Sequence, residues 1–218
     1  MRELLSAAYT YYLANQERFT TELGRHVALS GSALAISLSI CIPLGIWAAR
    51  HATIAQYVIN AVGALRLIPS LAILFLVLPY LGTGFSSALI ALTVLALPPV
   101  LINVYVGILG VEPAVVEAAQ AMGMTTRQQL LQIELPLALP AIIAGVRIAT
   151  VEVISSATLA AFIGGGGLGI FITRGFAIFE PRIMLVGAIP VAVLALISEL
   201  ILGLVERWAS PHRSGRVS

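Results

Sequence analysis

Few residues of this chain belong to types that do chemistry, and several of these lie inside long apolar stretches. Arg66, Arg147, Glu152 and Glu199 each interrupt such a stretch. An unpaired charge at the centre of a bilayer costs about 2.5–3.5 kcal/mol on insertion scales, so such groups tend to face a cavity or a partner charge. Two interpretations of Glu152 stay open. It either faces a solute pathway, where a cationic solute would meet it, or pairs with a charge on another helix, such as Arg66, or on a second subunit.

Arg147 is the charged residue nearest to Glu152 in the sequence, but the two are poorly placed to pair. They are five residues apart, which on an α-helix separates them by about 140° around the axis. Arg147 is also a candidate for the pathway. Arg66 and Glu199 are expected near a membrane–water interface, which long charged side chains reach by extending toward water.

Enzyme chemistry is not expected from these residues. His26, His51 and His212 lie at the ends of apolar stretches or near the C-terminus, and none neighbours a serine inside a stretch, so a nucleophile with its base is missing. The single Cys41 allows neither a disulfide within the chain nor a metal cluster. The run Gly164–Gly167 lacks the lysine that follows the glycines of a phosphate-binding loop. We expect no ATP site, cofactor or metal in this chain.

The composition predicts an integral membrane protein. Hydrophobic residues make up 59% and charged residues only 10%, against about 25% charged in soluble domains. The net charge of +2 gives no reason to expect nucleic acid as a partner. A spanning helix needs about 20 apolar residues, and no internal repeat of the kind found in many secondary carriers is evident. The expected architecture is all-α with about five transmembrane helices, at residues 27–49, 58–80, 87–109, 137–160 and 183–205.

Residues 1–26 precede the first of these spans and have no cleaved-signal pattern. Leu5, Tyr9 and Tyr12 fall on one face of a helix, which suits a helix lying on the membrane surface. A loosely ordered tail is the alternative, and both interpretations stay open. Arginines are equally divided between the two sides of the expected topology, so their distribution does not decide its orientation.

A polar segment at residues 112–136 interrupts the apolar sequence and carries strong helix signals. Pro113 suits the first turn of a helix, and Gly123 suits the left-handed position that ends one. Thr125 and Thr126 are N-cap candidates for a second helix, with Gln128 and Gln129 at the reciprocal capping-box position. A short helix exposed at a membrane face can dock in the groove of a partner. A solvated, well-capped connector is the alternative.

The same segment carries the spacing of a known motif. Its fixed positions are Glu117, Ala118, Ala119, Gly123, Ile133, Leu135 and Pro136. This spacing resembles the EAA loop of permease subunits of binding-protein-dependent ABC importers. Residues 68–84, 96–124 and 157–169 are similar to the subgroup that imports glycine betaine, choline, carnitine and related osmoprotectants. Another small solute (a thiol-betaine, an amino acid or a sulfonate) is the alternative, and a self-sufficient secondary carrier is a more distant one.

The resemblance implies the type I ABC importer permease fold, with a cytosolic coupling helix at residues 114–122. A second permease subunit, identical or a sister chain, would complete the pathway. Cytosolic ATPase subunits would bind ATP and Mg and receive the coupling helix. A substrate-binding protein, expected as a separate chain because no large soluble domain occurs in the sequence, would deliver solute from outside. The chain would span a bacterial cytoplasmic membrane with its N-terminus outside and residues 209–218 as a cytosolic tail.

Two further sets of residues are candidates for the solute pathway and its gate. Tyr80, Phe85 and Tyr105 are candidates for transient cation–π contact with a quaternary ammonium group, although aromatic residues near span ends are commonly interfacial anchors. The glycine-rich segment is expected to act as a flexible break or hinge before a short apolar segment, residues 168–178, that is re-entrant or plugs the outer mouth. Its glycines are Gly164, Gly165, Gly166, Gly167 and Gly169.

Overall fold

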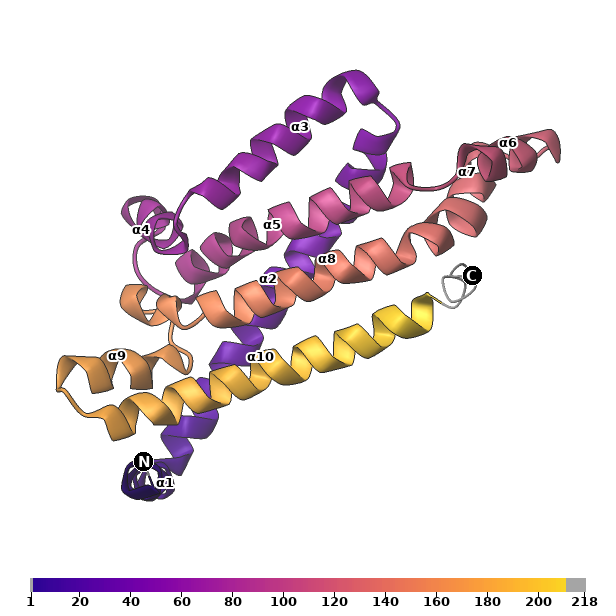
Figure 1. Cartoon of the computed structure of the whole chain (residues 1–218). Helices are drawn as coiled ribbons and strands as arrows, with labels where there is room; N and C mark the ends of the chain where they lie inside the picture. Colours follow the sequence, from indigo (N-terminus) through magenta and orange to yellow (C-terminus); the bar gives the residue numbers. More distant parts are fainter. Residues whose placement is uncertain (1, 211–218) are drawn as a thin grey trace.

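The computed structural model describes residues 2–210 and contains no strand within that range, which confirms the all-α prediction (Figure 1). The expected tail at residues 209–218, with His212, lies largely outside the described residues. The elements are α1 Arg2–Ala14, α2 Gln16–Ala49, α3 Ala52–Ala64, the 3-10 turn η1 Leu65–Leu67, α4 Ser70–Leu81, α5 Phe85–Leu109, α6 Pro113–Ala121, α7 Thr126–Gln129, the π-helical turn η2 Leu130–Glu134, α8 Leu135–Ser156, the 3-10 turn η3 Leu159–Ile163, α9 Gly169–Ala177 and α10 Pro181–Ala209.

Four helical stretches within residues 2–210 are long and apolar enough to cross a membrane: α2, α5, the continuous run from α7 to α8, and α10. A fifth crossing is formed if α3 and α4 count as one broken span. This agrees with the expected number of about five.

The span expected at residues 58–80 is not one straight helix. Its two halves meet at an angle of 98°, between η1 and α4. Ile68 at the break is extended (φ −84°, ψ 122°), because the residue before a proline is disfavoured in the helical region. Pro69 thus ends the first half, and α4 begins directly after it.

The helix that contains the first expected span begins earlier than residue 27. α2 runs unbroken from Gln16 to Ala49, so the helix continues through residue 26. Glu22 and His26, which precede the expected span, are buried in this chain. α1 is a separate helix that packs on α10, with Tyr12 edge-on to Phe19 of α2 at 4.9 Å between ring centroids. Residues 2–14 are therefore helical, while their location at the membrane surface stays a prediction.

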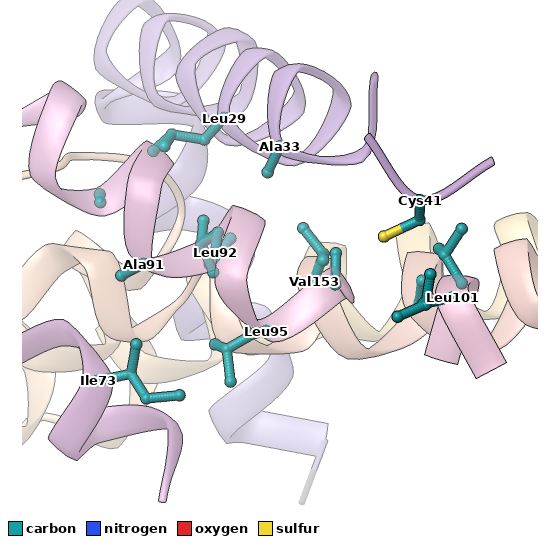
Figure 2. Close-up of a cluster of buried hydrophobic side chains, with 14 of the residues drawn as sticks. Leu29, Ala33, Cys41, Ile73, Ala91, Leu92, Leu95, Leu101 and Val153 are labelled. Carbon is teal, nitrogen blue, oxygen red and sulfur yellow. The ribbon is translucent and has the colours of Figure 1, made fainter. Parts of the chain in front are cut away.

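α5 is the central helix and packs between α2 and α8. Small residues allow the close approach that helices use inside membranes. A Cβ added at Gly45 of α2 would lie 2.6 Å from Val104 of α5, and one added at Gly145 of α8 would lie 2.5 Å from Asn103 of α5. Figure 2 shows the buried cluster that these helices share with α4; its labelled members are Leu29, Ala33, Cys41, Ile73, Ala91, Leu92, Leu95, Leu101 and Val153.

The helices give the molecule two distinct ends (Figure 1). α6 and α7 lie at one end, together with the last turn of α10. α1, α9 and the glycine-rich segment lie at the opposite end. The long helices therefore connect the loop that carries the EAA spacing to the glycine-rich segment.

Candidate functional site

The helix expected at residues 114–122 is α6, and it starts as the sequence predicts. Pro113 occupies its first turn, where the missing N–H is not needed. The carbonyl oxygen of Glu112 accepts the amide of Val115 at 3.0 Å. The helix ends one residue earlier than expected, at Ala121.

Gly123 ends this helix in the left-handed conformation, with φ +79°. The amide of Met122 donates to the carbonyl oxygen of Ala118 at 3.0 Å, and the amide of Met124 donates to that of Ala119 at 3.1 Å. No atom lies within 4 Å of a Cβ placed at Gly123. The backbone conformation, rather than lack of space, therefore requires glycine here.

α7 begins with the capping box that the sequence suggests, and Thr125 rather than Thr126 is the cap. The amide of Gln128 donates to Thr125 Oγ1 at 3.4 Å, and the amide of Thr125 donates to Gln128 Oε1 at 2.8 Å. Gln129 is buried and donates through Nε2 to the carbonyl oxygen of Met124 at 2.8 Å. Together with the bond from Thr125 Oγ1 to Gln128 Oε1 at 2.9 Å, these side-chain hydrogen bonds fix the turn between the two helices.

The residues of the EAA spacing do not all face solvent. Glu117 and Ala118 are exposed, whereas Ala119 is buried in this chain. The expectation that Ala119 would contact a partner ATPase is therefore wrong for this conformation of the chain. Its small side chain instead lets α6 sit closely on the rest of the chain. Ile133 in η2 and Leu135 at the start of α8 are half-buried, and Pro136 of α8 is exposed.

A part-buried ion pair lies directly behind this loop. Glu134, in the π-helical turn, is 5% exposed and accepts from Arg50 Nη2 at the end of α2. Sequence reasoning missed this pair because the two residues are 84 positions apart. Each residue can be recognised in the sequence as a charge beside an expected span, but no nearby sequence pattern indicates that the two side chains pair.

Arg147, expected as a pathway candidate, instead joins α8 to α10. Its Nε lies 3.1 Å from Glu199 Oε1, and its Nη1 lies 2.7 Å from Glu206 Oε2. Glu199 therefore has a charged partner as well as partial exposure. Glu152 is half-buried and, among residues 2–210, forms no ion pair, with the exposed Arg66 or any other group.

The aromatic candidates do not come together within one subunit. Tyr80 is exposed at the end of α4, next to the start of α5, where Phe85 is also exposed. Tyr105 lies in the last turns of α5, roughly 30 Å from Phe85 by the helical rise. No cage for a cation is formed by these three residues.

The glycine-rich segment is closely packed. Gly165–Gly169 are buried, and Gly164, Gly166 and Gly167 have left-handed φ values of 74°, 80° and 85°. A Cβ at Gly169 would lie 1.9 Å from the carbonyl oxygen of Thr158. The glycines are thus needed for conformation and close approach, and the short apolar segment that follows them is α9.

The N-terminal part of α2 holds this segment in place. The amide of Gly167 donates to Glu22 Oε2 at 2.7 Å. His26 is fully buried, and its Nε2 lies 3.1 Å from the carbonyl oxygen of Ile154, so it donates there because a carbonyl can only accept. Arg25 Nη1 lies 3.7 Å from Glu22 Oε1. From the sequence, these residues were placed in a segment before the first span, and their contacts with the glycine-rich segment and α8 were not predicted.

A cavity of about 690 Å³ lies between α5, α8 and the end of α10, beside the EAA loop. Its wall combines small residues with a few polar groups, among them Asn103, Gly107, Pro140, Ala144 and Glu206. Most of the other lining residues are small or apolar, so the wall is mainly apolar with a few polar groups, as in many small-molecule sites.

The sequence of residues 41–211 matches the family described as the binding-protein-dependent transport system inner membrane component. This match covers well over half of the chain and includes the whole EAA loop. The chain belongs to this family. It is therefore a multi-pass transport subunit of the inner membrane.

Curated relatives match almost the full length. The chain is 39% identical over 207 residues to the carnitine transport permease protein OpuCB of Listeria monocytogenes, covering 95% of each. It is 38% identical over 202 residues to the glycine betaine/carnitine/choline transport system permease protein OpuCB of Bacillus subtilis, covering 93% of each. It is 39% identical to the choline transport system permease protein OpuBB of Bacillus subtilis, covering 85% of this chain and 86% of that one.

Solved structures agree on the fold. The MetNI methionine ABC transporter in an inward-facing conformation matches with a TM-score of 0.82 over 89% of this chain and 97% of that one, at 20% identity. An amino acid ABC transporter matches with a TM-score of 0.70 over 91% and 97% of the two chains, at 21% identity. The fold is that of type I ABC importer permeases.

Proposed function

We propose that this chain is the membrane subunit of an ATP-driven importer of quaternary-ammonium osmoprotectants such as glycine betaine, carnitine or choline. The observation that carries the proposal is the identity of 38–39% over nearly the whole chain to permeases named for these solutes. The likeness to the methionine transporter supports the fold alone, because the identity is only 20%.

Coupling to ATP is proposed to run through α6. A short helix that projects at one end of the bundle, with exposed Glu117 and Ala118, has the form of a helix that docks in a groove. Gly123, Thr125 and Gln129 fix its orientation relative to α8 through the contacts described above. ATP and Mg would be held by the partner ATPase, and this chain would contribute neither a cofactor nor a catalytic residue.

The remaining partners follow from the family. A second permease subunit, identical or a sister chain, would complete the pathway, and a binding protein would deliver solute at the opposite end from α6. The exposed apolar face of α10, with Leu196, Leu200 and Leu204, would be covered by lipid or by that second subunit. In this arrangement α6 and the C-terminus are cytosolic, and α1 and α9 are extracytoplasmic.

The cavity beside the EAA loop is proposed as part of the solute route. It is lined by Asn103 and Glu206, whose polar groups suit a hydrated zwitterion or cation. The carboxylate of Glu206 is paired with Arg147, so the cavity does not present an isolated negative charge that would trap a cation. Weak binding in the permease would leave selection to the binding protein.

Uptake in cells tests this assignment. The chain is expressed with its own ATPase and binding protein in bacteria that lack other osmoprotectant importers, and uptake of labelled glycine betaine is measured with unlabelled competitors. Inhibition by carnitine or choline, and none by an amino acid or a sulfonate, is expected. Uptake of an amino acid or sulfonate instead, with no glycine betaine uptake, would refute the substrate class while leaving the permease assignment intact.

A further inference from the structure

α2 and α8 are joined by polar side chains near both of their ends. Arg50 of α2 pairs with Glu134 immediately before α8, and His26 of α2 donates to the carbonyl oxygen of Ile154 near the end of α8. By the helical rise, the two contacts are roughly 36 Å apart along α2 and 30 Å apart along the η2–α8 run. Helices inside membranes associate by packing of small residues and by side-chain hydrogen bonds between helices, and here the polar contacts of α2 with the η2–α8 run lie near opposite ends of α2.

In the contact beside the EAA loop, Arg50 neutralises the buried carboxylate of Glu134. Glu134 is almost completely buried, and a buried carboxylate without a partner is strongly unfavourable. Arg50 is the C-terminal cap of α2, where a positive charge also interacts favourably with the helix dipole. The π-helical turn Leu130–Glu134 forms part of the same junction, and such turns are frequent at functional sites.

The contact at the opposite end holds both α8 and the segment that follows it. The carbonyl of Ile154 is one of the last four of α8, which lack partners within the helix. His26 supplies a donor for it. One turn earlier on α2, Glu22 accepts the amide of Gly167 in the glycine-rich segment. α2 therefore contacts the EAA loop junction at one end and the glycine-rich segment at the other.

We infer that α2 and α8 move as one body with the EAA loop and carry its displacement to the glycine-rich segment at the far end of the molecule. Arg50, Glu134, Glu22 and His26 are the positioning residues of this body. The inference rests on the proposed function, because it takes the EAA loop to be the part that an ATPase moves. The two end contacts give this body a packed and hydrogen-bonded connection between the two sites, and the experiment below measures whether the sites are coupled through it.

The test follows the environment of the glycine-rich segment during the ATP cycle. In the complete complex, Cys41 is replaced by serine and the exposed Phe162, two residues before Gly164, by cysteine. Labelling of the new cysteine by a membrane-impermeant maleimide is compared without nucleotide and with ATP and vanadate. The parent is expected to show rates that differ by roughly fivefold or more, a typical allosteric coupling. Arg50→Glu or Glu134→Arg should abolish the difference, and the double exchange should restore it.

A second pair of variants tests the far end. Glu22→Gln should abolish the labelling difference while ATP hydrolysis continues, and Glu17→Gln, at an exposed position of the same helix, should leave it unchanged. Arg182→Glu, which breaks the exposed pair with Glu180, controls for loss of an ion pair elsewhere.

Three results would overturn the inference: no labelling difference in the parent, an undiminished difference in the single variants, or no recovery in the double exchange. Each is separable from failure of the proposed function, because ATP-driven uptake by the parent complex is measured in the same preparation. If that uptake is absent, the proposed function fails independently of the labelling result.

Discussion

Gln129 and Met124 are linked by a hydrogen bond of 2.8 Å from Nε2 to the carbonyl oxygen, which ties the first turn of α7 back to the end of the α6 turn. The Gln129 side chain is buried and the hydrogen bond is part-buried, so the access of water to this bond is restricted. Together with the left-handed Gly123 it fixes the direction in which α6 leaves the bundle. A docking helix needs a fixed orientation. A partner bound to α6 would move α8 only if the turn between them were rigid.

Gly123→Pro is expected to abolish transport while the complex still assembles in the membrane. Proline is locked near φ −65° and cannot adopt the observed φ of +79°. It also removes the amide that donates to the carbonyl oxygen of Gln120. Uptake is expected to fall at least about tenfold, equivalent to about 1.4 kcal/mol in the barrier, while ATP hydrolysis persists.

Gly123→Asn is the matched control, because asparagine tolerates the left-handed region. It should retain most of the uptake. Full uptake by the proline variant would show that the geometry of this turn does not matter for coupling.

Arg147→Ala is expected to destabilise the complex by about 1–3 kcal/mol, since it leaves Glu199 and Glu206 without their charged partner. Thermal unfolding in detergent measures the change. Arg182→Ala is the control: it breaks the exposed Arg182–Glu180 pair, which should cost at most about 1 kcal/mol. Equal effects of the two substitutions would argue against a structural role for the α8–α10 ion pairs.

Gly169→Ala is expected to prevent normal packing of α9. Its Cβ would lie 1.9 Å from the carbonyl oxygen of Thr158. Because a backbone atom can move away only if the helix shifts, we expect the free energy of unfolding to fall by about 3 kcal/mol. At Gly24 of α2 no atom lies within 4 Å of an added Cβ, and Gly24→Ala should leave the melting temperature unchanged or slightly raised. The expectation for α9 is contradicted if both variants unfold at the temperature of the parent.

The cavity beside the EAA loop can be tested by filling it. Ala144→Leu places a larger side chain in its wall and should reduce uptake without changing ATP hydrolysis in proportion. Leu139→Phe enlarges an exposed position on the same helix and should have little effect. Normal transport by Ala144→Leu would exclude this cavity from the solute route.

Local signals in the sequence predicted local structure well. Pro113, Gly123, Thr125 and Gln128 each act on neighbours within four residues, so the α6–α7 loop could be described without any tertiary information. The number and approximate position of the spans followed from apolar length in the same way.

Contacts between distant residues could not be predicted. Arg50–Glu134 and His26–Ile154 depend on how α2 packs against α8, and no periodicity encodes that packing. For the same reason His26 seemed to mark the edge of a span, although its burial makes it an internal contact. The 98° break between α3 and α4 was signalled by Pro69, but apolar length alone favoured one continuous helix.

ATP-driven uptake in proteoliposomes tests the central claim most directly. The complex is purified with its ATPase and binding protein, and labelled glycine betaine, choline, carnitine and an unrelated amino acid are offered in turn. Uptake of one or more osmoprotectants that requires both ATP and the binding protein is the predicted result. Uptake by this chain alone, driven by an ion gradient without ATP, would contradict the account and identify a secondary carrier.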